Sequence, residues 1–122
     1  MLLTQLELEH VLRQVRTAFP NLVDWEYNNE VDADYFGFTI WGRFVPQEDA
    51  ESLSERRFYV TFDIYQDKWR GTVTIGQHSY LWTSADVGDA HLVSTEPCAS
   101  LEEAIAALKV KIADVAKAFS AV

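Results

Sequence analysis

The feature that most constrains the fold is a change of hydrophobic period along the chain. Apolar residues recur every three or four positions near both ends of the 122-residue chain, and at every second position between them. The first spacing predicts amphipathic helices and the second predicts half-buried strands. The sequence therefore predicts a chain that begins and ends with a helix and has a sheet in between.

The N-terminal helix has a start signal and a stop signal. Thr4 and Glu7 have the spacing of a capping box, and Pro20-Asn21 ends the pattern. The apolar stripe of this helix consists of Leu8, Leu12, Val15 and Phe19. We expect that stripe to pack against the sheet.

The C-terminal helix repeats the same arrangement. Ser100 and Glu103 form a second capping-box pattern, and lysines gather toward the helix end, as the helix dipole favours. The apolar stripe consists of Leu101, Ile105, Leu108, Ile112, Val115 and Phe119. Neither helix has the basic polar face of a membrane-surface helix, so both stripes are interpreted as core.

Between the helices the sequence is rich in aromatic and β-branched residues. Alternating sets occur at Val23, Trp25 and Tyr27, at Phe36, Phe38, Ile40 and Phe44, and at Phe58, Val60, Phe62 and Ile64. Residues 46–55 form a polar break in which a short helical turn is possible. We predict one two-layer α+β domain over residues 1–122, with a five-stranded, largely antiparallel sheet and both helices on one face.

Two turns set the expected strand pairing. A turn at Asp67-Lys68 pairs Ile64 with Gly71, Phe62 with Val73, and Val60 with Ile75. A type II′ turn at Gly76-Gln77 places His78 opposite Ile75, Tyr80 opposite Val73, and Trp82 opposite Gly71, where its ring would fill the space beside the glycine. Both turns give the same apolar face, on which we expect Phe58, Phe62, Tyr80 and Trp82 to be buried.

The opposite face of the sheet carries the candidate interaction surface. Two helices cover only one face of a five-stranded sheet, so the other face is expected to be open. It would hold Tyr35, Trp41, Arg43, Tyr59, Tyr65 and Arg70. Aromatic residues and arginine are favoured at protein interfaces, whereas scattered surface aromatics are the ordinary alternative.

Charge and composition exclude several classes of partner. The formal net charge is −9, which repels nucleic-acid phosphates and anionic lipid and could attract a basic protein, or could simply aid solubility. No apolar run reaches the roughly 20 residues of a membrane span. The N-terminal residues lack a secretory pattern and the chain has a single cysteine, so we expect a cytoplasmic protein.

No residues with a recognisable catalytic, cofactor-binding or metal-binding pattern stand out. The acidic run from Asp24 to Asp34 lacks the glutamate that an EF-hand loop needs at its twelfth position, and a hairpin with an acidic tip explains it better. The three histidines have no zinc-type spacing. Cys98 precedes the second helix, where a thiol can gain reactivity, but it is interpreted as a buried or idle thiol. We therefore expect no cofactor and no metal.

Three functions stay open. In order of elements, size and acidity the chain is loosely similar to secretion-chaperone-like folds, a similarity of topology and pI from which no residue is carried over. The leading hypothesis is a non-enzymatic protein-interaction or chaperone/adaptor-like domain that forms a homodimer or binds a protein partner through its open face. The second is a small-ligand-binding protein or enzyme with a pocket between the sheet and the C-terminal helix. The third is an acidic decoy of a basic nucleic-acid-binding protein.

Overall fold

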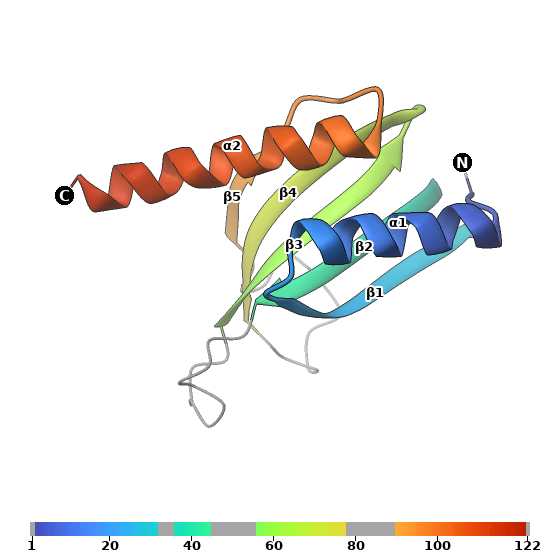
Figure 1. Cartoon of the computed structure of the whole chain (residues 1–122), viewed down its shortest axis with the longest axis horizontal. Coiled ribbons are helices and arrows are strands. Elements are labelled where there is room, and N and C mark those ends of the chain that lie inside the picture. The colour runs from blue at the N-terminus through green and yellow to red at the C-terminus, as the bar shows by residue number, and fades with distance from the viewer. Residues whose placement is uncertain (1, 32–35, 45–55, 78–89, 122) are drawn as a thin grey trace.

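The computed structural model describes residues 2–31, 36–44, 56–77 and 90–121. Their elements follow in the order α1 (Gln5–Ala18), β1 (Leu22–Val31), β2 (Phe36–Phe44), β3 (Arg56–Tyr65), β4 (Lys68–Gln77), β5 (Ala90–Ser94) and α2 (Leu101–Ser120). The strands form one antiparallel sheet in chain order. Both helices lie on the same face of that sheet (Figure 1), so the predicted α+β fold is confirmed.

The predicted capping box begins α1. The Thr4 hydroxyl accepts the backbone N–H of Glu7 at 3.2 Å, and the Glu7 carboxylate accepts the backbone N–H of Thr4 at 2.9 Å. The hydrogen bond from the Thr4 backbone, aided by the Thr4 hydroxyl, lowers the pKa of Glu7 below its ordinary value. A second contact fixes the approach to the helix, because the Asn29 side chain of β1 pairs with the backbone of Leu3.

The start of α2 has only half of the predicted capping box. Ser100 accepts the backbone N–H of Glu103 at 3.1 Å. The Glu103 carboxylate, however, accepts the N–H of Ala99 rather than that of Ser100. The reciprocal hydrogen bond has moved one residue toward the N-terminus, and the helix still begins at Leu101 as expected.

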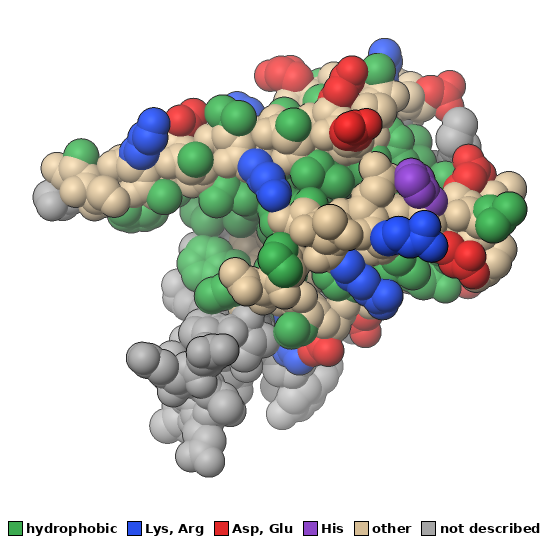
Figure 2. Space-filling model, in the orientation of Figure 1, with side chains coloured by type: hydrophobic (Ala, Val, Ile, Leu, Met, Phe, Trp, Pro, Cys, Tyr) green, Lys and Arg blue, Asp and Glu red, His purple; other side chains and the backbone are tan. Residues whose placement is uncertain are grey.

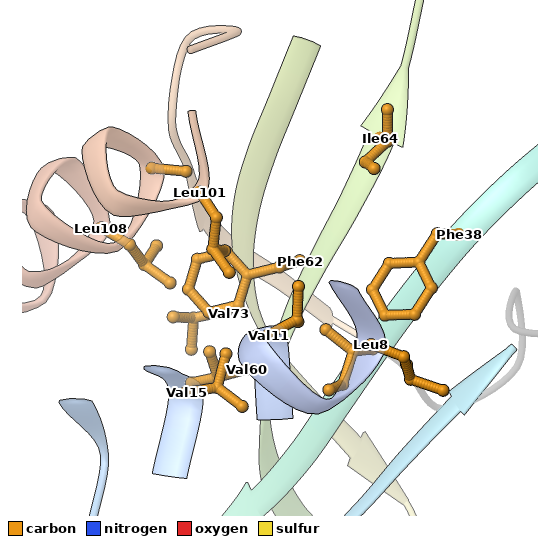
Figure 3. Packing of buried hydrophobic residues seen from close by; sticks show 12 residues of the cluster. Leu8, Val11, Val15, Phe38, Val60, Phe62, Ile64, Val73, Leu101 and Leu108 are labelled. Atoms are coloured by element: carbon orange, nitrogen blue, oxygen red, sulfur yellow. The ribbon is translucent and has the colours of Figure 1, made fainter. Parts of the chain in front are cut away.

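The core lies between the two helices and the middle three strands (Figure 3). Phe62 and Ile40 of the sheet and Leu108 and Val15 of the helices are fully buried. The remaining buried members are Leu8, Val11, Phe38, Val60, Ile64, Val73, Leu101 and Ala104. Burying each of these larger side chains contributes roughly 1.5–3 kcal/mol to folding, before the loss of conformational entropy is counted.

The predicted turn at Asp67-Lys68 is wrong by one residue. The turn residues are Gln66 and Asp67, both with positive φ, which is the requirement of a type I′ hairpin turn. The pairs across β3 and β4 are Val60 with Val73, Phe62 with Gly71, and Ile64 with Trp69. This register differs from the predicted one by two residues, so every side chain keeps its predicted face.

The predicted turn at Gly76-Gln77 is also wrong. Both residues belong to β4 and pair with Arg57 and Arg56 of β3. Continued pairing satisfies more backbone groups than an early turn would, and a Gly-X pair alone is a weak turn signal. The other side of β4 pairs with β5, which sets Val93 opposite Val73. The predicted partners His78, Tyr80 and Trp82, and the helical turn in 46–55, lie outside the described residues.

The space beside Gly71 is filled by Phe62, its partner across the strand pair. A Cβ atom at position 71 would lie 2.8 Å from the Phe62 ring and 3.2 Å from the Leu108 side chain. On the other side, Thr95 accepts the Gly71 N–H through its hydroxyl and donates its own N–H to the Gly71 carbonyl. An aromatic ring over this glycine was expected, but its source is β3.

Candidate functional site

Four of the predicted interaction residues lie on the open face of the sheet. Trp41 and Arg43 of β2, Tyr59 of β3 and Arg70 of β4 point away from both helices, since their strand neighbours Ile40, Val60 and Gly71 are buried. Trp41, Arg43 and Tyr59 are half-buried and Arg70 is exposed. Tyr35 lies outside the described residues, and for Tyr65 only the backbone is described.

A hollow of about 500 Å³ gathers three of these residues. It is lined by Asp24, Trp25, Glu26, Trp41, Arg43 and Tyr59. The Arg43 guanidinium forms an ion pair with Asp24, to which its Nε also donates at 2.8 Å. The Trp41 indole N–H donates to Glu26 at 3.2 Å. Side chains of β1 thus hold both β2 residues in place.

A bulge in β1 explains why Asp24 reaches Arg43. The register shifts between Val23, which pairs with Arg43, and Glu26, which pairs with Trp41. Asp24 has a φ of 54° in this bulge. The extra residue breaks the alternation predicted for Val23 and Trp25, so Val23 lies on the open face, whereas Trp25 lies over Gly42 on the helix side.

Arg70 belongs to a separate contact on the open face. It pairs with Asp63 of β3 at 3.2 Å, its direct partner across the two strands. The second oxygen of this carboxylate, Asp63 Oδ1, is shielded from solvent and has no hydrogen-bond partner among the described residues. The structure therefore brings Trp41, Arg43 and Tyr59 together and leaves Arg70 in a pair of its own.

A second concave site lies between the sheet and the C-terminal half of α2. It is an apolar groove of about 490 Å³. Its lining residues are Ala18, Phe19, Pro20, Asn21, Leu22, Phe44, Phe58, Val60, Val73, Leu92, Val93, Ile112, Val115, Ala116 and Phe119. Figure 2 shows apolar side chains gathered below this half of the helix. We call this site the α2 groove.

Two residues of the α2 groove correct the predicted core. Phe58 and Phe119 were assigned to buried faces, yet their exposed fractions are 45% and 74%. Both lie on the predicted side of their strand or helix. They stay exposed because α1 ends at Ala18, whereas α2, about 30 Å long, extends past the edge of the sheet (Figure 1).

The lining of the α2 groove offers almost no polar chemistry. None of the described lining residues is titratable, and Asn21 is the one polar side chain among them. A positive charge lies close to one lining residue, because Lys109 Nζ is 5.3 Å from the centre of the Phe19 ring. The described part of the groove is therefore suited to apolar contact.

Cys98 and His91, which were also noted in the sequence, both make contacts within the fold. Cys98 packs half-buried against the core, and its backbone pairs with that of Trp69. His91 hydrogen-bonds to Ser94 at 2.6 Å. Within the described ranges, no three His, Cys, Asp or Glu side chains are grouped so as to hold a metal ion. In the same ranges no helix is long and apolar enough to cross a membrane.

Comparison of the chain with protein-family models, curated proteins and solved structures gave no match.

The sequence patterns did not identify the residues of the α2 groove. A pocket between the sheet and the C-terminal helix was among the open alternatives, but its residues were assigned to the core. The sequence signal that could have revealed it was the length of α2. A helix of twenty residues has an apolar stripe that is longer than a five-residue edge strand such as β5 can cover.

Proposed function

We propose that this chain is a non-enzymatic binding module that takes an apolar segment of a partner protein, in the form of an amphipathic helix, into the α2 groove. The observation that carries the proposal is the exposure of large apolar side chains along one concave surface. Phe44, Phe58, Leu92 and Phe119 all line the groove and all expose between 39% and 74% of their surface. Contiguous exposed apolar surface of this kind marks interaction sites.

The openness of the groove favours a protein segment over a small ligand. Small-ligand pockets enclose most of their ligand, so their walls are largely buried once the chain has folded. Here Phe58 exposes 45% of its surface and Phe119 exposes 74%. A partner helix that places apolar side chains at helical spacing would cover both rings and fill the floor at Val60 and Val73.

The apolar lining also supports a binding role rather than catalysis. A molecule lying in the groove meets aliphatic and aromatic carbon from both helices and from all five strands. Specific acid–base catalysis needs a titratable group within hydrogen-bond reach of the reacting atoms. The described lining provides no titratable group, so it can contribute apolar contact area to a complex.

The test uses a neutral amphipathic peptide built of Leu, Gln and Ala, with leucines at helical spacing and a fluorescent label. A neutral probe keeps the charge of the chain from deciding the result. We expect saturable binding to the wild-type protein by fluorescence anisotropy. Ala116→Phe places a ring in the groove and should weaken binding about tenfold, as expected of overpacking at a contact site.

Ala113→Phe is the matched control, because Ala113 is exposed on the same helix and lies outside the groove lining. It should bind the peptide as the wild type does. Equal weakening by both variants would place the contact elsewhere. Palmitate is the competing probe: tight one-to-one binding of palmitate without any binding of the peptide would make the groove a small-ligand pocket and refute the proposal.

A further inference from the structure

The hollow on the open face has the chemistry of a site for a basic side chain. Asp24 and Glu26 bring two carboxylates from β1, and Arg43 brings one guanidinium from β2. The Arg43 guanidinium is engaged by Asp24. The three charges leave an excess of one negative charge in the hollow, within a chain whose formal net charge is −9.

Two aromatic side chains complete the walls. Trp41 pairs across the strands with Thr61, and Tyr59 pairs with Arg43, so Trp41 and Tyr59 are diagonal neighbours on β2 and β3. Diagonal neighbours lie roughly 7–8 Å apart at their backbones, within reach of a common ligand for side chains of this size. Aromatic faces attract a guanidinium or ammonium group, and nearby carboxylates strengthen that attraction.

Hydrogen bonds within the hollow hold these groups in position before a ligand arrives. The Trp41 indole N–H donates to one oxygen of Glu26 at 3.2 Å. A carboxylate has about four lone-pair sites, so Glu26 can accept further donors while it keeps this bond. Groups fixed in advance lose less conformational entropy when a ligand binds.

We propose that this hollow binds a lysine or arginine side chain from a basic segment of a partner protein, between the rings of Trp41 and Tyr59 and beside the carboxylate of Glu26. The site is distinct from the α2 groove, because the two lie on opposite faces of the sheet. A cation is favoured over an anion by the negative excess in the hollow and by the field of the whole chain.

Charge also argues against a second copy of this chain as the occupant. Bringing two open faces together would place both acidic hollows and two chains of charge −9 against each other. Like charges in contact cost several kcal/mol unless they are paired. A basic partner gains from the same field.

The experiment titrates the full chain with a hexaarginine peptide at low salt, followed by calorimetry and by the indole N–H resonance of Trp41. Glu26→Gln should weaken binding about fivefold, the value of one exposed ion pair. Glu30→Gln is the matched control: it removes the same charge from the same face of the same strand, and Glu30 lies outside the hollow. It should change the affinity less than about twofold.

Each outcome decides for or against the site. Unequal effects of the two glutamine variants, with a shifted Trp41 indole signal, support it. Equal effects would show that hexaarginine senses only the net charge, and no binding by the wild type would also refute the proposal. A dimer that Trp41→Leu converts to a monomer would make the face a self-interface and overturn it. Ala116→Phe should leave hexaarginine binding unchanged, which separates this site from the proposed groove.

Discussion

The centre of the helix-covered face and its end at the α2 groove are built from the same residue types, yet they differ in how completely they are packed. At the centre, Phe62 of β3 is fully buried beneath the helices. Four residues earlier on the same strand, and on the same face, Phe58 exposes 45% of its surface. The difference shows that alternation decides which face a side chain takes, whereas the reach of the helices decides whether that face is covered.

The two regions should therefore respond differently to mutation. A fully packed region has no room for added atoms and leaves a cavity when atoms are removed. A half-covered region tolerates both changes in a monomer, and its apolar surface becomes useful only when a partner covers it. We therefore expect the centre to carry the stability of the fold, whereas binding at the groove is our proposal.

The largest expected effect is the difference in stability lost when Phe62 and Phe58 are each replaced by alanine. Phe62→Ala should lower the free energy of unfolding by about 3–5 kcal/mol, because the ring is fully buried among core side chains. Phe58→Ala should cost less than about 1.5 kcal/mol, since nearly half of that ring already contacts water. Urea unfolding of both variants measures the two values. Similar losses would mean that the groove is part of the packed core.

The next largest effect is expected when a substitution adds one carbon atom to the packed centre. Gly71→Ala would bring its Cβ within 2.8 Å of the Phe62 ring and should destabilise the protein by about 1–3 kcal/mol. The ring is held on all sides, so it cannot move away without cost. Urea unfolding of the double variant with Phe62→Leu provides the check, because losing the ring should relieve the clash and make the two costs less than additive. Strict additivity would show that the clash is absent.

Much of the fold could be predicted from the sequence because its signals are local. The Thr4–Glu7 capping box, the two helical stripes and the alternation of Phe58, Val60, Phe62 and Ile64 each involve a few neighbouring residues. Side chains alternate between the two faces of a strand, so the predicted faces were correct even though the register was wrong by two residues. The turn at Gly76-Gln77 failed because a Gly-X pair is equally compatible with a continuing strand.

The sites were harder to predict because they depend on long-range geometry. The contact of Arg43 with Asp24 requires the β1 bulge, and the sequence around Trp25 and Glu26 has no local pattern that predicts this bulge. The α2 groove depends on how far α2 extends past the sheet, which a helical stripe that includes Phe119 does not reveal. Periodicity could identify Trp41 and Tyr59 as residues of one face, but not the hollow between them.

The smallest expected effect comes from the capping box at the start of α1, which supports the packed centre. Hydrogen bonds from Thr4 hold the pKa of Glu7 lower in the folded protein than in the unfolded chain. The capping contribution of Glu7 is therefore fully present at neutral pH and is lost as the pH falls through the folded pKa, which lies below the ordinary pKa of a glutamate. Since the same turn carries the buried Leu8, loss of the cap should loosen the centre and not the groove.

Urea midpoints of the wild type and of Glu7→Gln at neutral and acidic pH measure this effect. The wild type should have the higher midpoint at neutral pH, and the difference should shrink as the solution is acidified below the ordinary pKa of a glutamate. Thr4→Ser keeps the hydroxyl and should keep the pH dependence, whereas Thr4→Ala should reduce it and cost about 0.5–2 kcal/mol at neutral pH. A wild-type advantage of the same size at both pH values would mean that the Glu7 carboxylate does not stabilise the start of α1 through its charge.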